Sequence, residues 1–403
     1  MTNALDVLRQ IDAIVNQNNK LEPGALLEFD WDSILMMASS GLILPHIYVS
    51  LRTKKALEFL EADFADYLHE IYRLNKERNE AILNQAQVIA KTLQEEDIEF
   101  VFLKCTALLI SDYYSDIGSR MVGDIDLLVN EQDQERADAL FRKAGYINNV
   151  EKSNIGKLDI ADHRHLSRLV HPDYIGAVEI HKKVTDQTIE SLDPLAILKD
   201  KEECKGMPIP NLKHLCLHNI YNWQLNDNGY ILSMVGFRSY CDSLVFLQKN
   251  KTQVSALFGA DQKTKKYASL LSTFSKAFQS FAPFAFSKML FKASKKNKLF
   301  NSALYYMHYM RLITFKAVPF LVHRSFLFVT HKGYRKAAWK DRRRIANPYI
   351  KLSPNRMRLI TVILRRGRIW IPCVGVRGCL SFLRIENHKC THSSKRSKLS
   401  IFA

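Results

Sequence analysis

The spacing of apolar residues changes at Ile98, and this change constrains the fold more than any other feature of the chain. Before it, apolar residues recur every three or four positions along 55–95 without proline or glycine, which predicts one long amphipathic helix. After it come short apolar runs bounded by turn-forming residues, each predicting a β-strand: 99–103, 125–129, 165–170 and 177–181. The chain therefore passes from a helical region into a sheet-forming one.

Helical stretches separate the first strands and return after the last one. Residues 106–114 and 133–144 are expected to be helices, and Gly145 is a suitable C-terminal residue for the second. The order from Ile98 onward is β-α-β-α-β-β. After Pro194 the apolar spacing becomes helical again, with helices expected at 211–225, 230–249, 252–258, 263–280 and 301–316.

These patterns predict an α+β fold in four regions. A small mixed-sheet core at 96–190 is inserted between an N-terminal helical region at 1–95 and a C-terminal helical region at 191–340. Residues 341–403 form a basic tail that is expected to be partly disordered, since its periodicity is weak and its charge is high. The 403 residues are enough for two or three domains with a sizeable core.

The positive charge of the chain is concentrated at its C-terminal end. The formal net charge is +17, and 19 Lys and Arg but only 2 Asp and Glu lie between His331 and Ala403. The rest of the chain is therefore neutral. This distribution argues against a nucleic-acid surface over the whole body and favours a tail that contacts an anionic partner or a membrane surface.

The cysteines and the apolar segments indicate a cytoplasmic protein. Seven cysteines are scattered without a disulfide-framework spacing, and the N-terminus lacks the apolar run of a signal peptide. The most apolar stretch, 299–329, is interrupted by charged residues and histidines, so no transmembrane helix is expected. That stretch fits either a buried helical pair or a membrane interface, which leaves peripheral membrane association open.

Asp124 and Asp126 are the first candidate site residues. Side chains at i and i+2 of a strand point to the same side, so both carboxylates leave one sheet face while Ile125, Leu127 and Val129 take the other. Two aligned carboxylates repel each other unless a cation lies between them, and their hard oxygen atoms suit Mg²⁺. Asp-x-Asp alone is weak evidence, because two surface aspartates at a strand edge give the same pattern.

Glu179 supplies a third carboxylate on the last strand. It lies between the apolar residues Val178 and Ile180, which are expected on the opposite face. Three carboxylates can hold two metal ions, the arrangement that supports an in-line displacement at phosphorus. Asp124, Asp126 and Glu179 are therefore the predicted catalytic and metal-binding residues.

Several motifs together resemble a bacterial family named uncharacterised nucleotidyltransferase, which belongs to the polymerase-β-like superfamily. The similarity spans about residues 25–250 and is carried by Leu103-Lys104-Cys105-Thr106-Ala107-Leu108, by Arg120, by Gly123-Asp124-Ile125-Asp126-Leu127-Leu128-Val129, by Ala144-Gly145-Tyr146 and by Val178-Glu179-Ile180-His181. Together these motifs are specific, although none is specific alone.

The resemblance implies a reaction and a set of phosphate-binding residues. The implied reaction is transfer of a nucleoside monophosphate from a nucleoside triphosphate, with ATP expected, to an acceptor hydroxyl, assisted by two Mg²⁺ ions. The acceptor is unknown: a sugar, a lipid, a protein or a nucleic-acid end. The nucleotide- and phosphate-binding candidates are Lys104, Cys105, Thr106, Arg120 and His181.

One residue departs from the family pattern. Cys105 stands where the family has glycine after the lysine, and its Cβ adds bulk at a turn where a triphosphate would approach the backbone. The alternative function is therefore a nucleotide-binding or regulatory module that has lost turnover.

Structural roles remain open for the other candidates. Lys104 could be a solvent-facing residue at a strand end, and Arg120 could form a structural ion pair instead of contacting phosphate. Thr106 could cap the following helix, and His181 could orient a carboxylate. The spacing of Arg238 and Asp242, four residues apart, favours an ion pair on one helix.

Overall fold

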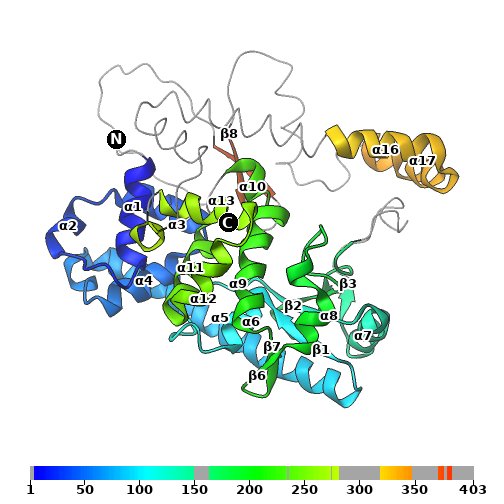
Figure 1. Ribbon diagram of the computed structural model, residues 1–403, viewed down its shortest axis with the longest axis horizontal. Coiled ribbons are helices and arrows are strands. Elements are labelled where there is room, and N and C mark those ends of the chain that lie inside the picture. Colours follow the sequence, from blue (N-terminus) through cyan, green and yellow to red (C-terminus); the bar gives the residue numbers. More distant parts are fainter. Residues whose placement is uncertain are drawn as a thin grey trace, which may run out of the picture. The chain divides into compact units, whose positions relative to one another are not determined.

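The computed structural model describes residues 4–148, 163–233, 236–273, 275–280, 318–346, 371–375 and 379–383 (Figure 1). Internal contacts divide the chain into two compact units, 1–338 and 339–403. The first unit includes residues 1–95 and 96–190 and the third expected region up to residue 338.

Short helices precede one long helix in the N-terminal region. Asp30 caps one of them by accepting a hydrogen bond from the Ser33 amide at 3.2 Å. The elements are α1 Ala4–Val15, α2 Pro23–Leu27, α3 Trp31–Ser40, α4 Leu44–Thr53, a 3₁₀ turn Leu57–Phe59 and α5 Ala62–Glu95. The long helix begins at Ala62 and not at residue 55, because Lys55 has a left-handed backbone (φ 53°) that interrupts helical continuity.

The buried face of α5 is partly polar, which differs from the apolar stripe expected from the sequence. Leu74 is 49% exposed, whereas Asn75 and Asn79 are buried. Asn79 Nδ2 donates to the carbonyl oxygens of Ile117 and Arg120 at 2.6 and 2.8 Å, and Asn75 Nδ2 donates to that of Gly118 at 2.8 Å. The amides face inward because the loop before the second strand presents buried carbonyl groups that need donors.

A mixed sheet forms the centre of the core, as the sequence predicted, and it has five strands. Its order is β1-β2-β5-β4-β3, with β2 and β5 parallel and all other neighbours antiparallel. The strands are β1 Phe100–Leu103, β2 Asp124–Val129, β3 Ile147–Asn148, β4 Leu169–Val170 and β5 Ala177–His181. Strand β3 was not predicted, because two exposed residues carry no readable alternation.

The two helices of the core lie where the sequence predicted them, but the first of them ends earlier than expected. Helix α6, Lys104–Ile110, stops before residue 114 because Ser111 adopts an extended backbone. A 3₁₀ turn, Glu131–Asp133, leads into α7, Gln134–Lys143. Gly145 follows with φ +96°, a conformation that glycine adopts at helix ends without strain.

The two faces of the sheet pack against different cores. Phe102, Ile125, Leu127, Val178 and Ile180 belong to the larger apolar cluster, which includes residues of α5, α6 and α7. The other face contributes to a smaller cluster that contains Val101, Leu103, Leu128, Leu217 and Tyr221. Asp124, Asp126 and Glu179 share the second face by strand alternation, which places them beside the smaller core.

The C-terminal region is helical, with one hairpin that was not predicted. The elements are a 3₁₀ turn Glu190–Leu192, α8 Pro194–Lys199, β6 Glu202–Cys204, β7 Met207–Ile209, α9 Leu212–Tyr221, a π-helical turn Asn222–Asn226, α10 Gly229–Leu232, α11 Phe237–Lys249, α12 Lys251–Phe258, α13 Gln262–Ser272 and a 3₁₀ turn Lys276–Phe278. Left-handed residues Lys205 and Gly206 turn the β6–β7 hairpin. The helix expected at 230–249 is broken because Ser233 is also left-handed.

Two helices and a hairpin complete the described chain. They are α16 Val318–Thr330, α17 Lys332–Ala346, β8 Ile371–Gly375 and β9 Cys379–Leu383. The helix expected at 301–316 and the disorder expected in the last fifteen residues lie outside the described residues. None of the described helices combines the length and the apolar character that crossing a bilayer requires.

A buried ion pair fastens the loop before β2 to α11. Arg120 donates from Nε and Nη2 to the two carboxylate oxygens of Asp242, both at 2.7 Å, and Tyr114 Oη donates to the same carboxylate at 2.6 Å. The predicted partner of Asp242 was Arg238. Asp242 instead faces inward, where the loop held by Asn75 and Asn79 presents Arg120.

We expect Asp242→Asn to destabilise the protein by about 3–5 kcal/mol, because it leaves the Arg120 guanidinium buried without a counter-charge. Urea unfolding would measure this. Asp138→Asn, which breaks the surface pair with Arg142 on α7, should cost less than about 1 kcal/mol. Equal midpoints for the two variants would contradict a structural role for the buried pair.

His46 should make stability sensitive to acid. Burial lowers the pKa of His46 to about 4, and its Nδ1 lies 2.6 Å from Ser119 Oγ. The unfolded chain takes up this proton near pH 6.5, whereas the folded chain does so only near pH 4, so stability falls as the pH drops through that window, by up to about 3 kcal/mol.

His46→Gln should therefore flatten the pH dependence of the unfolding free energy between about pH 6.5 and 4. Some slope should remain, because burial also lowers the pKa of His218 to about 3. An unchanged slope in the variant, measured by urea unfolding at a series of pH values, would show that His46 does not stay neutral when buried.

Candidate active site

Parallel pairing of β2 with β5 builds the acidic centre. The register sets Asp126 opposite Glu179 and Asp124 opposite Ala177. Because paired residues in neighbouring strands point to the same face, the two carboxylates meet on the side of the sheet that carries the smaller core. The structure thus places Asp126 and Glu179 on one sheet face, as the alternation of the two strands predicted.

Asp126, Glu179 and His181 form one compact donor group. One ligand atom from each lies within 4.8 Å of the others. His181 Nε2 donates to Asp126 Oδ1 at 2.9 Å and lies 3.6 Å from Glu179 Oε2, and the imidazole is fully buried. His181 therefore contacts both carboxylates, as a residue that orients them would.

Asp124 lies beside this group but has a different partner. Its carboxylate pairs with the guanidinium of Arg168, which directly precedes β4. Arg168 was not among the predicted residues. The predicted hairpin could have indicated Arg168. Its first strand, β4, runs antiparallel to β5, so the residue just before β4 lies near the end of the sheet where Asp124 begins β2.

Lys104 follows β1 and reaches the centre of the group. Its ammonium pairs with Asp126, and the β1–β2 register sets its neighbour Leu103 opposite Asp126. Lys104 has a left-handed backbone with φ 48°. For a residue with a Cβ this costs about 1–2 kcal/mol, so the ion pair and the strand-to-helix turn hold it in place.

Cys105 and Thr106 lie in the first turn of α6, and no side-chain hydrogen bond or ion pair is found between them and the carboxylates of the acidic group. Cys105 is a half-buried free thiol, and it is not among the residues with positive φ. The backbone at this position therefore does not require glycine. Thr106 does not cap the helix: its hydroxyl donates to the carbonyl of Asp124 at 3.1 Å and ties α6 to the start of β2.

Arg120 is not part of the acidic group. Its guanidinium is committed to Asp242 in the buried pair described above. The structure thus brings together Asp124, Asp126, Glu179, His181 and Lys104 from the predicted set.

The charges of the site are only partly balanced. Three carboxylates, on Asp124, Asp126 and Glu179, face the cations of Lys104 and Arg168. Burial works against ionisation of Asp126, but the Lys104 ammonium and the His181 hydrogen bond outweigh it and hold the pKa of Asp126 below its usual range. Asp126 is therefore a carboxylate at neutral pH.

The pKa values of the two other carboxyl groups shift in opposite directions. Burial raises the pKa of Asp124; Arg168 opposes this rise, and Asp126 and Glu179 add to it. Burial also works against ionisation of Glu179, yet the nearby His181 imidazole, 3.6 Å away, lowers the pKa of its carboxyl group. Crowded carboxylates of this kind lose repulsion when a cation enters.

His165 adds a second imidazole at the edge of the group. Its Nε2 lies 3.9 Å from Glu179 Oε2, and its ring centroid lies 4.9 Å from that of His181. Since His165 Nδ1 lies 2.7 Å from the Leu166 carbonyl, that nitrogen carries the proton and Nε2 keeps its lone pair in the neutral form. Burial lowers the pKa of His165, which favours this neutral form.

The donor set fits a divalent metal ion. The carboxylates of Asp126 and Glu179, beside that of Asp124, offer oxygen ligands to Mg²⁺, and the His181 imidazole holds them in orientation. Among the described residues, three carboxylates face two cations, so the remaining negative charge would attract such an ion.

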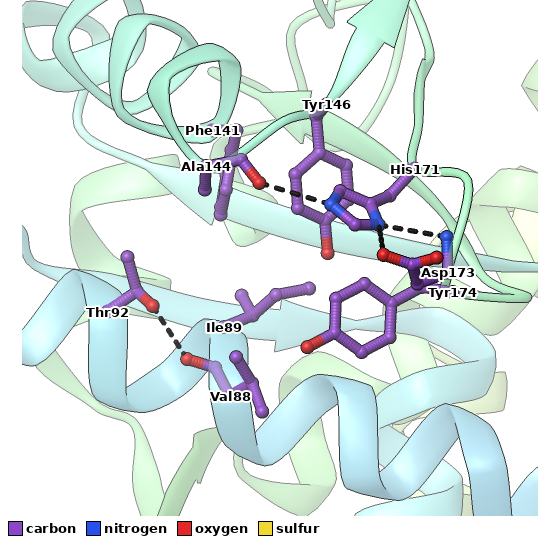
Figure 2. Close-up of a pocket in the computed structure, with 9 residues that line it drawn as sticks. All are labelled: Val88, Ile89, Thr92, Phe141, Ala144, Tyr146, His171, Asp173 and Tyr174. Carbon is purple, nitrogen blue, oxygen red and sulfur yellow. Dashed lines mark hydrogen bonds and ion pairs between the residues drawn. The ribbon is translucent and has the colours of Figure 1, made fainter.

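A cavity of about 160 Å³ lies on the other side of the sheet, among residues of the larger core (Figure 2). Figure 2 shows the rings of Tyr146, His171 and Tyr174 gathered at one wall, across from Val88 and Ile89 of α5. Gly145 allows this packing, because a Cβ there would meet His171 Nε2 at 2.8 Å. The Gly-Tyr motif thus has a packing role.

One comparison with known proteins, the family model, agrees with the motifs. No curated protein matches the chain. One similar solved structure is the solution structure of the antibiotic-resistance factor ANT(2'')-Ia, with 13% identity, a TM-score of 0.30, and coverage of 45% of this chain and 90% of that chain. The family model described as uncharacterised nucleotidyltransferase matches residues 28–260, more than half of the chain. The chain therefore belongs to the uncharacterised nucleotidyltransferase family, and its enzyme class is nucleotidyltransferase.

Proposed function

We propose that this nucleotidyltransferase moves a nucleoside monophosphate group from a nucleoside triphosphate, ATP being the expected donor, to an acceptor hydroxyl and releases pyrophosphate. The observation that carries the proposal is the convergence of Asp126, Glu179 and His181 beside Asp124 on one sheet face. This is a place where a divalent ion and the phosphates bound to it would find oxygen ligands and nearby cations.

Asp124, Asp126 and Glu179 are the residues that would hold Mg²⁺, with two ions expected. When bound, such ions neutralise charge on the transferring phosphoryl group and on the leaving oxygen. His181 contributes by fixing the orientation of Asp126 and Glu179 through its buried Nε2. The parallel strand pair keeps these side chains in place without rearrangement, which is the preorganisation that such catalysis requires.

Lys104 and Arg168 are the proposed phosphate-binding cations. Each is paired with a carboxylate of the site, Lys104 with Asp126 and Arg168 with Asp124. A triphosphate brings more negative charge than either aspartate, so both side chains would gain by turning toward it. Arg168 takes the role first considered for Arg120, whose guanidinium is buried against Asp242.

Cys105 and Thr106 would shape the phosphate turn through their backbone. The Thr106 hydroxyl holds the turn against the start of β2. Glu179 and His165 would accept a proton from the acceptor hydroxyl, since the lowered pKa of each leaves it unprotonated, with a lone pair available, at neutral pH.

The alternative is a nucleotide-binding or regulatory module without turnover, for which Cys105 is the motivation. The structure weakens one argument for it, because the backbone at Cys105 is not in the left-handed region. The remaining argument for this alternative is the volume that the Cys105 side chain occupies at the turn where a triphosphate would approach.

The proposal extends to the surroundings of the enzyme. The acceptor would be a sugar, a lipid, a protein or a nucleic-acid end. The basic tail at 341–403 would contact an anionic partner or a membrane surface, and the protein would act in the cytoplasm or peripherally at its membrane.

Asp126→Asn should lower NTP turnover by about a thousandfold or more, equivalent to about 4 kcal/mol of barrier, because it removes a metal-binding carboxylate. Calorimetry should also find weaker Mn²⁺ and Mg²⁺ binding. Asp138→Asn on the surface of α7 is the matched control and should leave both unchanged. Turnover of Asp126→Asn within a few-fold of the native protein would defeat the assignment.

Cys105→Gly separates the active enzyme from the lapsed module. For an active enzyme we expect turnover to stay within a few-fold, with a loss of up to about 1 kcal/mol in stability from glycine in the first turn of α6. Labelled NTPs incubated with a cell extract would report transfer by both proteins. Turnover in the variant but none in the native chain would instead identify a lapsed enzyme.

A further inference from the structure

Helix α16 exposes a continuous apolar stripe. Its members recur at i, i+3, i+4, i+8 and i+11, the spacing of one helix face, and their exposed fractions are 47, 61, 63, 62 and 73%: Val318, Leu321, Val322, Phe326 and Val329. Such a stripe normally packs against a core. Here it lies exposed, on a helix that contains no acidic residue.

Helix α17 contacts a different side of α16 but buries none of its residues: Phe320 and Phe328, outside the stripe, are 56 and 48% exposed. Arg324 Nη1 donates to Tyr334 Oη of α17 at 3.2 Å, and the same guanidinium lies 4.9 Å from the ring centroid of Phe320. Tyr334 is buried at 5% exposure. Arg324 and Leu327, the two partly buried positions of α16, lie off the stripe, so contact with α17 leaves the stripe open.

Cations follow immediately after the stripe. Lys332, Arg335 and Lys336 in the first turns of α17 are exposed. Arg335 Nη1 donates to the carbonyl of Phe328 at 3.3 Å, which places its guanidinium at the C-terminal end of α16 beside the exposed Val329. The same helix continues with the exposed residues Trp339 and Lys340.

We propose that α16 and α17 attach this protein to the surface of a bilayer that contains anionic phospholipid. The apolar stripe would enter the boundary between headgroups and acyl chains, while the lysines and arginines would contact the lipid phosphates. Tryptophan is favoured at the same depth. A helix of 13 residues spans about 20 Å and lies along such an interface without crossing the bilayer.

The combination of features favours a lipid surface over two other partners. A nucleic acid would engage the cations but leave the five apolar side chains in water. A second copy of the chain would cover the stripe, but it would bring the same cations together, since α17 carries basic residues in every described turn. An anionic bilayer surface would both bury the apolar stripe and pair with the basic side chains. This inference does not depend on the proposed reaction.

The test is flotation of the full chain with phosphatidylcholine vesicles that contain about one third phosphatidylserine, beside vesicles of phosphatidylcholine alone. We expect binding to the anionic vesicles, and binding weakened by salt. The double variant Val322→Ser, Phe326→Ser should bind about tenfold more weakly or worse, because it removes apolar area from the interface. Lys332→Gln, Lys336→Gln should also weaken binding, and only to the anionic vesicles.

Leu27→Ser in α2 is the matched control, because it removes a leucine that is 82% exposed from another helix, and it should bind as the native chain does. Equal thermal unfolding of all variants would exclude misfolding as the cause. The proposal is overturned if the stripe variant binds vesicles like the native chain. It is equally overturned if sedimentation shows a dimer that the stripe variant abolishes without any vesicle binding, or if RNA but not lipid retains the native chain.

Discussion

The parallel pairing of β2 with β5 is the interaction on which the candidate site depends. It alone brings Asp126 next to Glu179, two residues far apart in the sequence, and it sets His181 within hydrogen-bonding distance of the first carboxylate. Parallel strands need a long crossover, and the chain between them supplies α7 and the strands β3 and β4. A slip of one residue in this register would turn Glu179 into the larger core and leave Asp126 without its neighbour.

Collecting carboxylates on a partly buried face carries an electrostatic cost that the surrounding structure offsets. Lys104 and Arg168 neutralise part of the charge, and the left-handed backbone of Lys104 shows that the turn after β1 is held in an unfavourable conformation. In the proposed function the same two cations would bind the triphosphate. The arrangement that offsets the carboxylate repulsion is then also the one that would receive the nucleotide.

Polar contacts far from the acidic group keep the strand β2 in position. Asn75 and Asn79 of α5 satisfy the carbonyls of the preceding loop, and Arg120 in that loop pairs with Asp242 of α11. Both cores of the sheet depend on this placement, since β2 contributes Ile125 to one and Leu128 to the other. The residues before Asp124 thus act by placing the strand, and Arg120 in particular serves the fold.

The sequence by itself determined the fold class and the carboxylates that share a strand face, because strand alternation and apolar spacing are local properties of the chain. The family followed from the resemblance of several motifs, which the family model matches. The sequence also predicted four of the five strands of the sheet. It did not reveal β3, the break in the helix near Ser233 or the polar face of α5, since these depend on backbone dihedrals and on distant carbonyls that need donors. Only the tertiary structure decided that Arg120 binds Asp242 and that Arg168 reaches Asp124, because the choice of ion-pair partner depends on distance in space.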